Sequence, residues 1–247
     1  MAKIPNRPED IFEELRRDYT ALFGDDLVAI VLYGSGARGE YVPKKSDINL
    51  LIVLSDSGIE RLGDAVDAVA KWRKRNVRVP LVMTKGYIES SLDAFPLEFF
   101  NIKSAYQVVH GQDVLRDLAI GKEDLRLQCE RELKAKLLLV RESFLEAGNK
   151  PALLRELIVQ SLSAFISIFK ALLYLKGDEL ADKNEAVLAT TARSFGLDGD
   201  LFGTLWNIRR GQKKAGKDEL IGIVQKYINE IRKLWTQVDQ MNLQPGG

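Results

Sequence analysis

The chain has 247 residues, of which 46% are hydrophobic and 29% charged, and its formal net charge is +1. This length is enough for two modest domains or one large one, and the near-neutral charge gives no sign of a nucleic-acid partner. Because Cys129 is the only cysteine and His110 the only histidine, the chain can form neither an internal disulfide nor a zinc site built from Cys and His.

The first part of the chain mixes helical and strand patterns. Helices are expected where the apolar spacing is amphipathic, and strands where short apolar runs occur. The nearly continuous apolar run over 47–54 predicts a central strand. The expected elements in chain order are a helix over 8–23, strands over 27–33 and 47–54, a helix over 59–74, and strands over 77–84 and 95–102. Together these strands predict a small mixed sheet, and residues 108–113, with His110 before Gly111, are interpreted as the turn that closes this part.

From about residue 123 the pattern is helical only. The expected helices cover 124–148, 151–177, 180–195, 201–210 and 218–241. Short connections between amphipathic helices indicate an antiparallel bundle. The fold class is therefore α+β, with a first domain over 1–120, a helical bundle over 121–242 and a flexible tail over 243–247.

The helix expected over 151–176 is the most apolar one. Arg155, Glu156, Gln160 and Lys170 interrupt it, whereas a bilayer-spanning helix needs ~20 predominantly apolar residues with few charges. The pattern therefore favours the central helix of a bundle, without membrane contact and in the cytoplasm. The basic end of the helix over 59–74 complements the helix dipole and is a weak sign of a nucleic-acid surface.

The residues that carry chemistry lie between the first two strands. Residues 32–40 read Leu-Tyr-Gly-Ser-Gly-Ala-Arg-Gly-Glu, and Ser-Asp-Ile-Asn at 46–49 opens the next strand. Glycines let a backbone approach phosphate closely. Asp47 and Asn49, at positions i and i+2 of a strand, point to the same face. Carboxylate and amide oxygens suit a hard divalent cation.

This motif resembles the signature of the nucleotidyltransferase superfamily, which includes DNA polymerase beta and the minimal and kanamycin-type nucleotidyltransferases. The resemblance implies that Gly34 and Ser35 begin a helix that holds the phosphates of an NTP such as ATP. It also implies that Asp47 and Asn49 hold Mg²⁺. Arg38 is either a further phosphate ligand or a solvated charge.

The motif departs from the family at the metal ligands. Asn49 stands where the family has a second acid, and the strand expected over 77–84 has no acid, with Pro80 at the position where the third is expected. Glu98 is a candidate replacement as third ligand or general base, but a salt bridge or an outward-facing position explains it more simply. Pro80 also predicts a sheet edge or a bulge.

Two functions follow from the resemblance. The first is transfer of a nucleoside monophosphate from an NTP to a hydroxyl acceptor, either a small molecule or a protein. The second is a non-catalytic nucleotide-binding or assembly module. Because removing one transition-state donor costs ~10²–10³ in rate, the missing acids favour impaired or absent transfer. The layout resembles kanamycin-type enzymes, whose bundle helps to bind the acceptor and often forms a homodimer.

Overall fold

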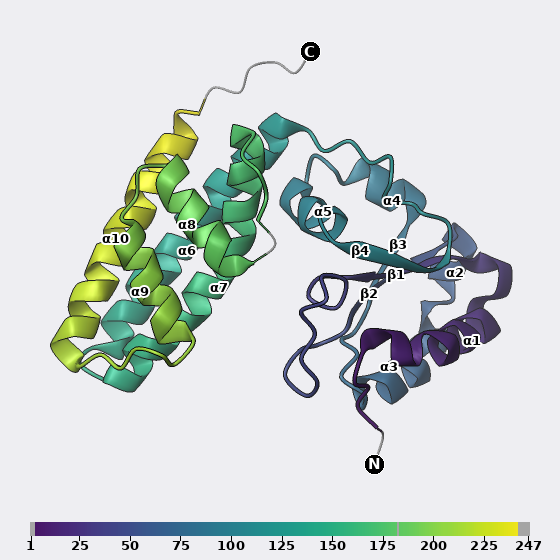
Figure 1. The fold of residues 1–247 in the computed structure, drawn as a ribbon. Coiled ribbons are helices and arrows are strands. Elements are labelled where there is room, and N and C mark those ends of the chain that lie inside the picture. The colour runs from purple at the N-terminus through teal and green to yellow at the C-terminus, as the bar shows by residue number, and fades with distance from the viewer. Residues whose placement is uncertain (1–2, 182, 242–247) are drawn as a thin grey trace. The chain divides into compact units, whose positions relative to one another are not determined.

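The computed structural model describes residues 3–181 and 183–241, and it is drawn as a ribbon in Figure 1. Contacts divide the chain into two units, the first ending at Ile120 and the second beginning at Gly121. The expected tail over 243–247 and the end of the expected bundle domain at residue 242 lie outside the described residues.

The first unit contains a small sheet with helices on both of its faces. Its elements are η1 (Pro8–Ile11), α1 (Phe12–Phe23), η2 (Gly24–Asp26), β1 (Leu27–Tyr33), β2 (Asn49–Leu54), α2 (Asp56–Glu60), η3 (Leu62–Ala65), α3 (Val66–Arg73), β3 (Leu81–Thr84), α4 (Lys85–Ser90), α5 (Pro96–Lys103) and β4 (Tyr106–Gly111), where η denotes a 3-10 helix.

The strand order in the sheet is β3-β2-β1-β4. β1 pairs antiparallel with both β2 and β4, and β2 pairs parallel with β3. The predicted mixed sheet is therefore confirmed, and β2 lies inside it as its apolar sequence predicted. β3 is an edge strand that begins directly after Pro80, which agrees with a proline at a sheet edge.

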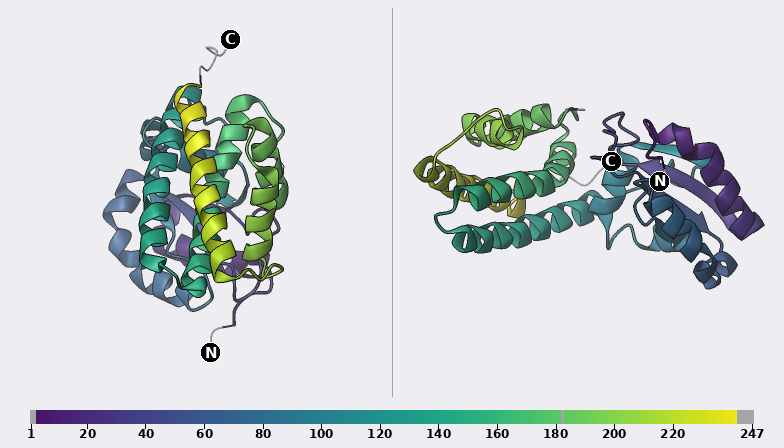
Figure 2. Two further views of the ribbon diagram at one scale, coloured as in Figure 1. Left: turned by 90° about the vertical axis from the view of Figure 1, so that its left-hand side faces the viewer. Right: turned by 90° about the horizontal axis from the view of Figure 1, so that it is seen from below.

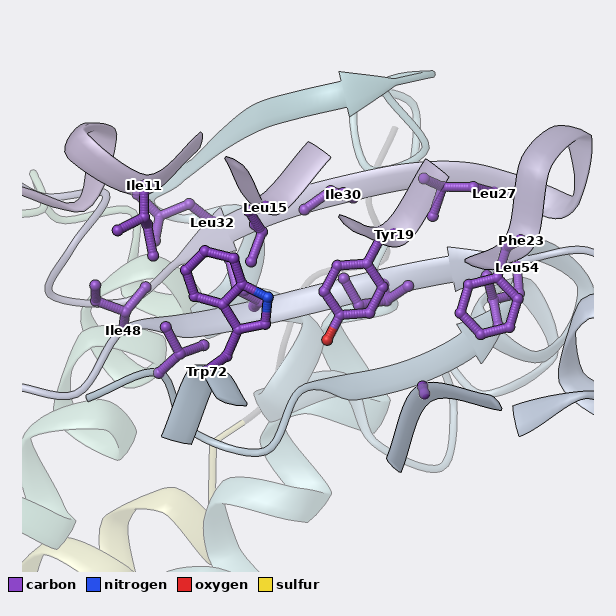
Figure 3. Close-up of a cluster of buried hydrophobic side chains, with 14 residues drawn as sticks. Ile11, Leu15, Tyr19, Phe23, Leu27, Ile30, Leu32, Ile48, Leu54 and Trp72 are labelled. Atoms are coloured by element: carbon purple, nitrogen blue, oxygen red, sulfur yellow. The ribbon is translucent and has the colours of Figure 1, made fainter. Parts of the chain in front are cut away.

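The side chains of the strands alternate between two hydrophobic cores. One core contains the buried residues of η1, α1 and α3 with Ile48, Leu50, Ile52 and Leu54, and we call this side of the sheet the α1 face. Figure 3 shows Tyr19 and Phe23 of α1 packed over the strands, with Trp72 of α3 beside them. The other core contains Phe99 and Ile102 of α5 with Leu51 and Val53, and we call this side the α5 face.

The structure corrects two expected elements near the end of this unit. Residues 95–102 were expected to form a strand, but α5 occupies them, with Pro96 at its first position and the acidic Glu98 in its first turn. A short apolar run that is buried on several sides does not distinguish a strand from a helix. The fourth strand is β4 instead, in which His110 pairs with Ile30 rather than lying in a closing turn.

Two further expectations need smaller corrections. The single helix over 59–74 is divided into α2, η3 and α3. Only Leu81–Thr84 of the expected strand over 77–84 pairs regularly, while Val77 forms one isolated bridge with Ile48.

The second unit is a bundle of long and short helices, as predicted. They are α6 (Lys122–Ala147), α7 (Pro151–Lys176), α8 (Asn184–Ser194), α9 (Gly199–Arg209) and α10 (Lys217–Asp239). Figure 2 shows these helices side by side, and α6 packs against both α7 and α10. α7 ends where Gly177 takes the left-handed conformation at φ +76°, as helix-terminating glycines commonly do.

Helix α7 supplies the centre of the bundle. Among the described residues it is the one helix long and apolar enough to cross a membrane, and 56% of its most apolar window is buried inside the structure. Phe165 and Phe169 of α7 stack with their ring centroids 5.9 Å apart, and Phe169 meets Phe202 of α9 edge to face at the same distance. Such aromatic pairs add to the free energy gained by burial.

We predict that Phe169→Ala lowers the free energy of unfolding of the bundle by about 3–5 kcal/mol, because it leaves a cavity among the stacked rings. The measurement is urea unfolding followed by far-ultraviolet circular dichroism. The matched control is Leu145→Ala on α6, whose side chain is 79% exposed and whose loss changes the free energy by no more than about 0.5 kcal/mol. Equal effects of the two substitutions would contradict the assigned core.

Candidate functional site

The turn that follows β1 is held by its own backbone. Gly34 takes φ +76°, and its carbonyl oxygen accepts a hydrogen bond from the N–H of Arg38 at 3.1 Å. The carbonyl oxygen of Ser35 accepts from the N–H of Glu40 at 2.9 Å. Gly39, at φ +72°, is the last residue of the turn. Residues 34–39 therefore form a single tight turn, and not the start of a regular helix that the family resemblance implied.

This turn leaves a row of backbone donors unused. The N–H of Gly34 donates to the carbonyl oxygen of Ala105 at 3.3 Å. In the part of the chain that the structure describes, the N–H groups of Ser35, Gly36 and Ala37 and the hydroxyl of Ser35 donate to no protein acceptor. Consecutive free N–H groups in a turn attract an anion such as phosphate.

Gly36 fixes the position of the turn on the unit. A Cβ atom there would lie 3.1 Å from Leu32 and 3.3 Å from Pro8, closer than most real contacts. Any larger residue would require Leu32 or Pro8 to shift by a few tenths of an ångström where the turn lies against the end of β1 and the start of η1. The turn that presents the free N–H groups therefore packs against the buried residues Leu32 and Pro8.

Asn49 lies beside the turn, and Asp47 comes just before β2. Ile48 is fully buried on the α1 face, so alternation along the strand directs Asn49 to the α5 face. Asn49 pairs with Tyr33, and its Nδ2 lies 3.3 Å from the place that a Cβ on Gly34 would occupy. The structure thus brings Gly34 and Asn49 together at the end of the sheet.

Asp47 is exposed, and with the described residues it forms no ion pair or hydrogen bond. The negative charge of Asp47 nevertheless affects the pKa of Tyr41. Burial raises the pKa of Tyr41, and the negative charges of Asp10 and Asp47 add to that rise. The hydroxyl of Tyr41 donates to the carbonyl oxygen of Pro5 at 3.2 Å. Asp47 is therefore a carboxylate that is open to solvent and available to a ligand.

The most consequential residue, Arg78, is one that sequence reasoning missed. Its N–H donates to the carbonyl oxygen of Ile48 at 2.9 Å, and Ile48 forms a parallel bridge with Val77. Val77 is buried on the α1 face like Ile48, so the next residue, Arg78, turns to the α5 face beside Asn49. Arg78 is exposed and forms no ion pair with any described residue. Arg78 therefore places a positive charge in the stretch 77–84, where the family resemblance implies a third acid.

An electrostatic effect on Tyr33 supports this placement. Tyr33 lies between Asn49 and Tyr106 in the sheet. Burial raises the pKa of Tyr33, and the positive charge of Arg78 opposes that rise. The positive charge of Arg78 thus acts on Tyr33, which packs against the core of the α5 face.

Glu98 does not lie on a strand that would turn it toward Asp47. It is exposed in the first turn of α5, whereas the other end of that helix leads to Ala105, which contacts Gly34. α5 replaces the strand on which Glu98 was expected, and its role as third ligand or general base stays a prediction.

Arg38 is bound to a neighbouring acid. Its Nε lies 3.1 Å from Oε2 of Glu40, and its side chain is 28% exposed. An ion pair this close to solvent contributes little and is readily exchanged for a phosphate. The structure therefore leaves both interpretations of Arg38 in place.

The donor set limits the metal chemistry of the site. Among the described residues, no group of three or more Asp, Glu, His or Cys side chains could hold a metal ion. Two Mg²⁺ ions bring four positive charges, which Asp47 and a neutral amide do not balance. A two-metal site does not fit these residues, whereas one Mg²⁺ carried by nucleotide phosphates would find Asp47 as a ligand.

We predict that Arg78→Met raises the pKa of Tyr33 further, because it removes the positive charge that favours the phenolate. The measurement is a pH titration of ¹³Cζ-labelled tyrosine by NMR. Arg73→Met, which removes a cation from α3 on the other face of the sheet, should leave that pKa unchanged. An unchanged pKa in Arg78→Met would show that Arg78 does not face Tyr33.

Comparisons with known proteins agree with this geometry. Residues 9–109 match the family model described as Nucleotidyltransferase domain. The solved structure of spectinomycin adenyltransferase from Enterococcus faecialis with ATP and spectinomycin is similar to 92% of this chain and 100% of that chain, at 12% identity and a TM-score of 0.53. At this identity the likeness shows the fold alone. No curated protein matches the chain. Residues 9–109 are therefore similar to a nucleotidyltransferase domain, and Asn49 stands where the family resemblance implies a second acid.

Proposed function

We propose that this protein is a nucleotide-binding module in which Arg78 performs the charge neutralisation that metal ions usually provide, and in which nucleotidyl transfer is weak or absent. The observation that carries the proposal is the position of Arg78 beside Asn49, without an acidic partner among the described residues. The ligand is an NTP such as ATP. Its phosphates would contact the free N–H groups of Ser35, Gly36 and Ala37.

The charges at the site support binding more than transfer. A guanidinium presents several donors to phosphate and can bind two oxygens at once. It has no carboxylate oxygen with which to hold a metal ion or accept a proton from an attacking hydroxyl. Transfer chemistry depends on neutralising both the attacking and the leaving oxygen, usually with two metal ions. Because Glu40 already pairs with Arg38, Asp47 is left as the carboxylate that would receive a metal ion, so the nucleotide is held but its transfer is poorly assisted.

A second function is favoured by a different observation. Asp47 is exposed and unpaired among the described residues, which suits a carboxylate that receives one Mg²⁺ with the nucleotide. The likeness to spectinomycin adenyltransferase extends over both units. On this alternative, the protein transfers a nucleoside monophosphate to a hydroxyl of a small molecule or protein, and the bundle contributes to acceptor binding or to a homodimer. For either function we propose the cytoplasm as the location.

The first experiment is calorimetric titration of ATP in the absence of Mg²⁺, with wild type and Arg78→Met. We expect the substitution to weaken binding ~10-fold or more, because a hydrogen bond to a charged group contributes ~1.5–3 kcal/mol. Arg73→Met is the matched control, since it removes the same charge from the other face of the sheet. Equal affinities in wild type and Arg78→Met would refute the proposed role of Arg78.

The second experiment separates the two functions. Pyrophosphate release from ATP is measured with Mg²⁺ and with spectinomycin as a trial acceptor, in wild type and Asp47→Asn. The binding module predicts release near the background rate in both proteins. Release that is well above background in wild type and at least ~100-fold lower in Asp47→Asn would establish the enzyme instead.

A further inference from the structure

The first unit contains a cavity on the side of the sheet that faces away from the candidate site. Its volume is about 540 Å³, within the range of ~300–1,000 Å³ that is typical of small-molecule sites. Tyr19 and Phe23 of α1, Ile52 and Leu54 of β2, and Val66 and Arg73 of α3 contribute to its lining. Ile52 and Leu54 belong to the α1 face, whereas Asn49 and Arg78 face the other side. The sheet therefore separates this cavity from the candidate nucleotide site.

The wall of the cavity is mostly apolar and partly open to solvent. The side chains at its base are buried, but Val66 is 66% exposed and Val79 57% exposed at its margin. Exposed apolar side chains around a concave surface are typical of ligand sites. This wall favours a ligand with an apolar body.

Tyr19 places a polar group in this apolar cavity. The residue is 2% exposed, and its hydroxyl forms no hydrogen bond with the described residues. Figure 3 shows the hydroxyl pointing away from α1. Burial raises the pKa of Tyr19 to about 12, so the hydroxyl keeps its proton and remains a donor. A ligand with an acceptor atom would therefore find an uncommitted donor in the cavity wall.

Arg73 adds a positive charge that its neighbours do not neutralise. Lys71 pairs with Glu14 at 2.8 Å and with Asp18 at 2.6 Å, and Arg75 also pairs with Glu14. Arg73, between them in sequence and part of the cavity lining, forms no ion pair with any described residue. Among the basic residues at the end of α3, Arg73 is therefore the cation that is both at the cavity and available to a ligand.

We propose that this cavity binds a small molecule with an apolar body and one carboxylate, such as a medium-chain fatty acid. The apolar body lies against the buried wall, the carboxylate pairs with Arg73, and the Tyr19 hydroxyl donates a hydrogen bond to a ligand oxygen. This inference does not depend on the proposed function, because it concerns different residues on the other face of the sheet.

The test is calorimetric titration of the full chain with decanoate below its micelle concentration, and with decanol as the uncharged probe. Arg73→Met should weaken decanoate binding ~10-fold, the loss expected for a charged hydrogen bond, while leaving decanol binding unchanged. Lys74→Met is the matched control, because it removes an exposed cation that does not line the cavity. It should leave both affinities unchanged.

Two further variants keep the proposal falsifiable. Tyr19→Phe retains the packing and should weaken decanoate binding a few-fold. Ala70→Trp adds a large side chain at an exposed lining position and should abolish binding of both probes. The proposal fails if decanoate does not bind the wild-type chain saturably. It also fails if Ala70→Trp binds as wild type does, or if Arg73→Met and Lys74→Met weaken decanoate binding equally.

Discussion

The alternation of side chains along β2 is the constraint on which the rest of the first unit depends. β2 lies between β1 and β3, and its side chains are buried in cores on both faces of the sheet, so they have no freedom to exchange sides. Burial of Ile48 on the α1 face directs Asn49 to the α5 face, beside Gly34 of the turn. The same alternation sends Ile52 to the wall of the cavity on the α1 face. One strand thus supplies residues to two chemically different sites.

The charged side chains around β2 determine which kind of ligand each site favours. Near the start of β2, the carboxylate of Asp47 and the guanidinium of Arg78 are both exposed, and neither pairs with a described residue. A phosphate chain would meet a fixed cation where the family resemblance implies carboxylates that hold metal ions. On the α1 face, Arg73 remains available because Glu14 and Asp18 already pair with its neighbours. In both sites, an unpaired arginine beside uncommitted hydrogen-bond donors favours an anionic ligand.

The elements that the sequence predicted well are those with a long or simple pattern. β1 covers the expected residues 27–33, and the two long helices of the bundle end within two residues of their expected bounds. The turn and Asp47 followed from local motifs. α5 was misassigned because a short buried apolar run has no clear period, whereas β4 is only half-buried and contains the polar residues Gln107 and His110. Arg78 was missed because its place depends on long-range pairing: Val77 opposes Ile48 while Leu81 opposes Leu51, so one extra residue is accommodated between them. That irregularity puts Arg78, rather than Val79, beside Asn49.

The most direct test of the account is the Mg²⁺ dependence of ATP binding in wild type and in Arg78→Asp, measured by calorimetry. If residue 78 stands beside Asn49 on the face of Asp47, the new aspartate provides a second carboxylate for a metal ion. The account predicts that Mg²⁺ changes the affinity of wild type little, and that Arg78→Asp binds ATP weakly without Mg²⁺ and at least ~10-fold more tightly with it. Wild-type binding that Mg²⁺ strengthens ~10-fold, together with no gain of Mg²⁺ dependence in Arg78→Asp, would contradict it.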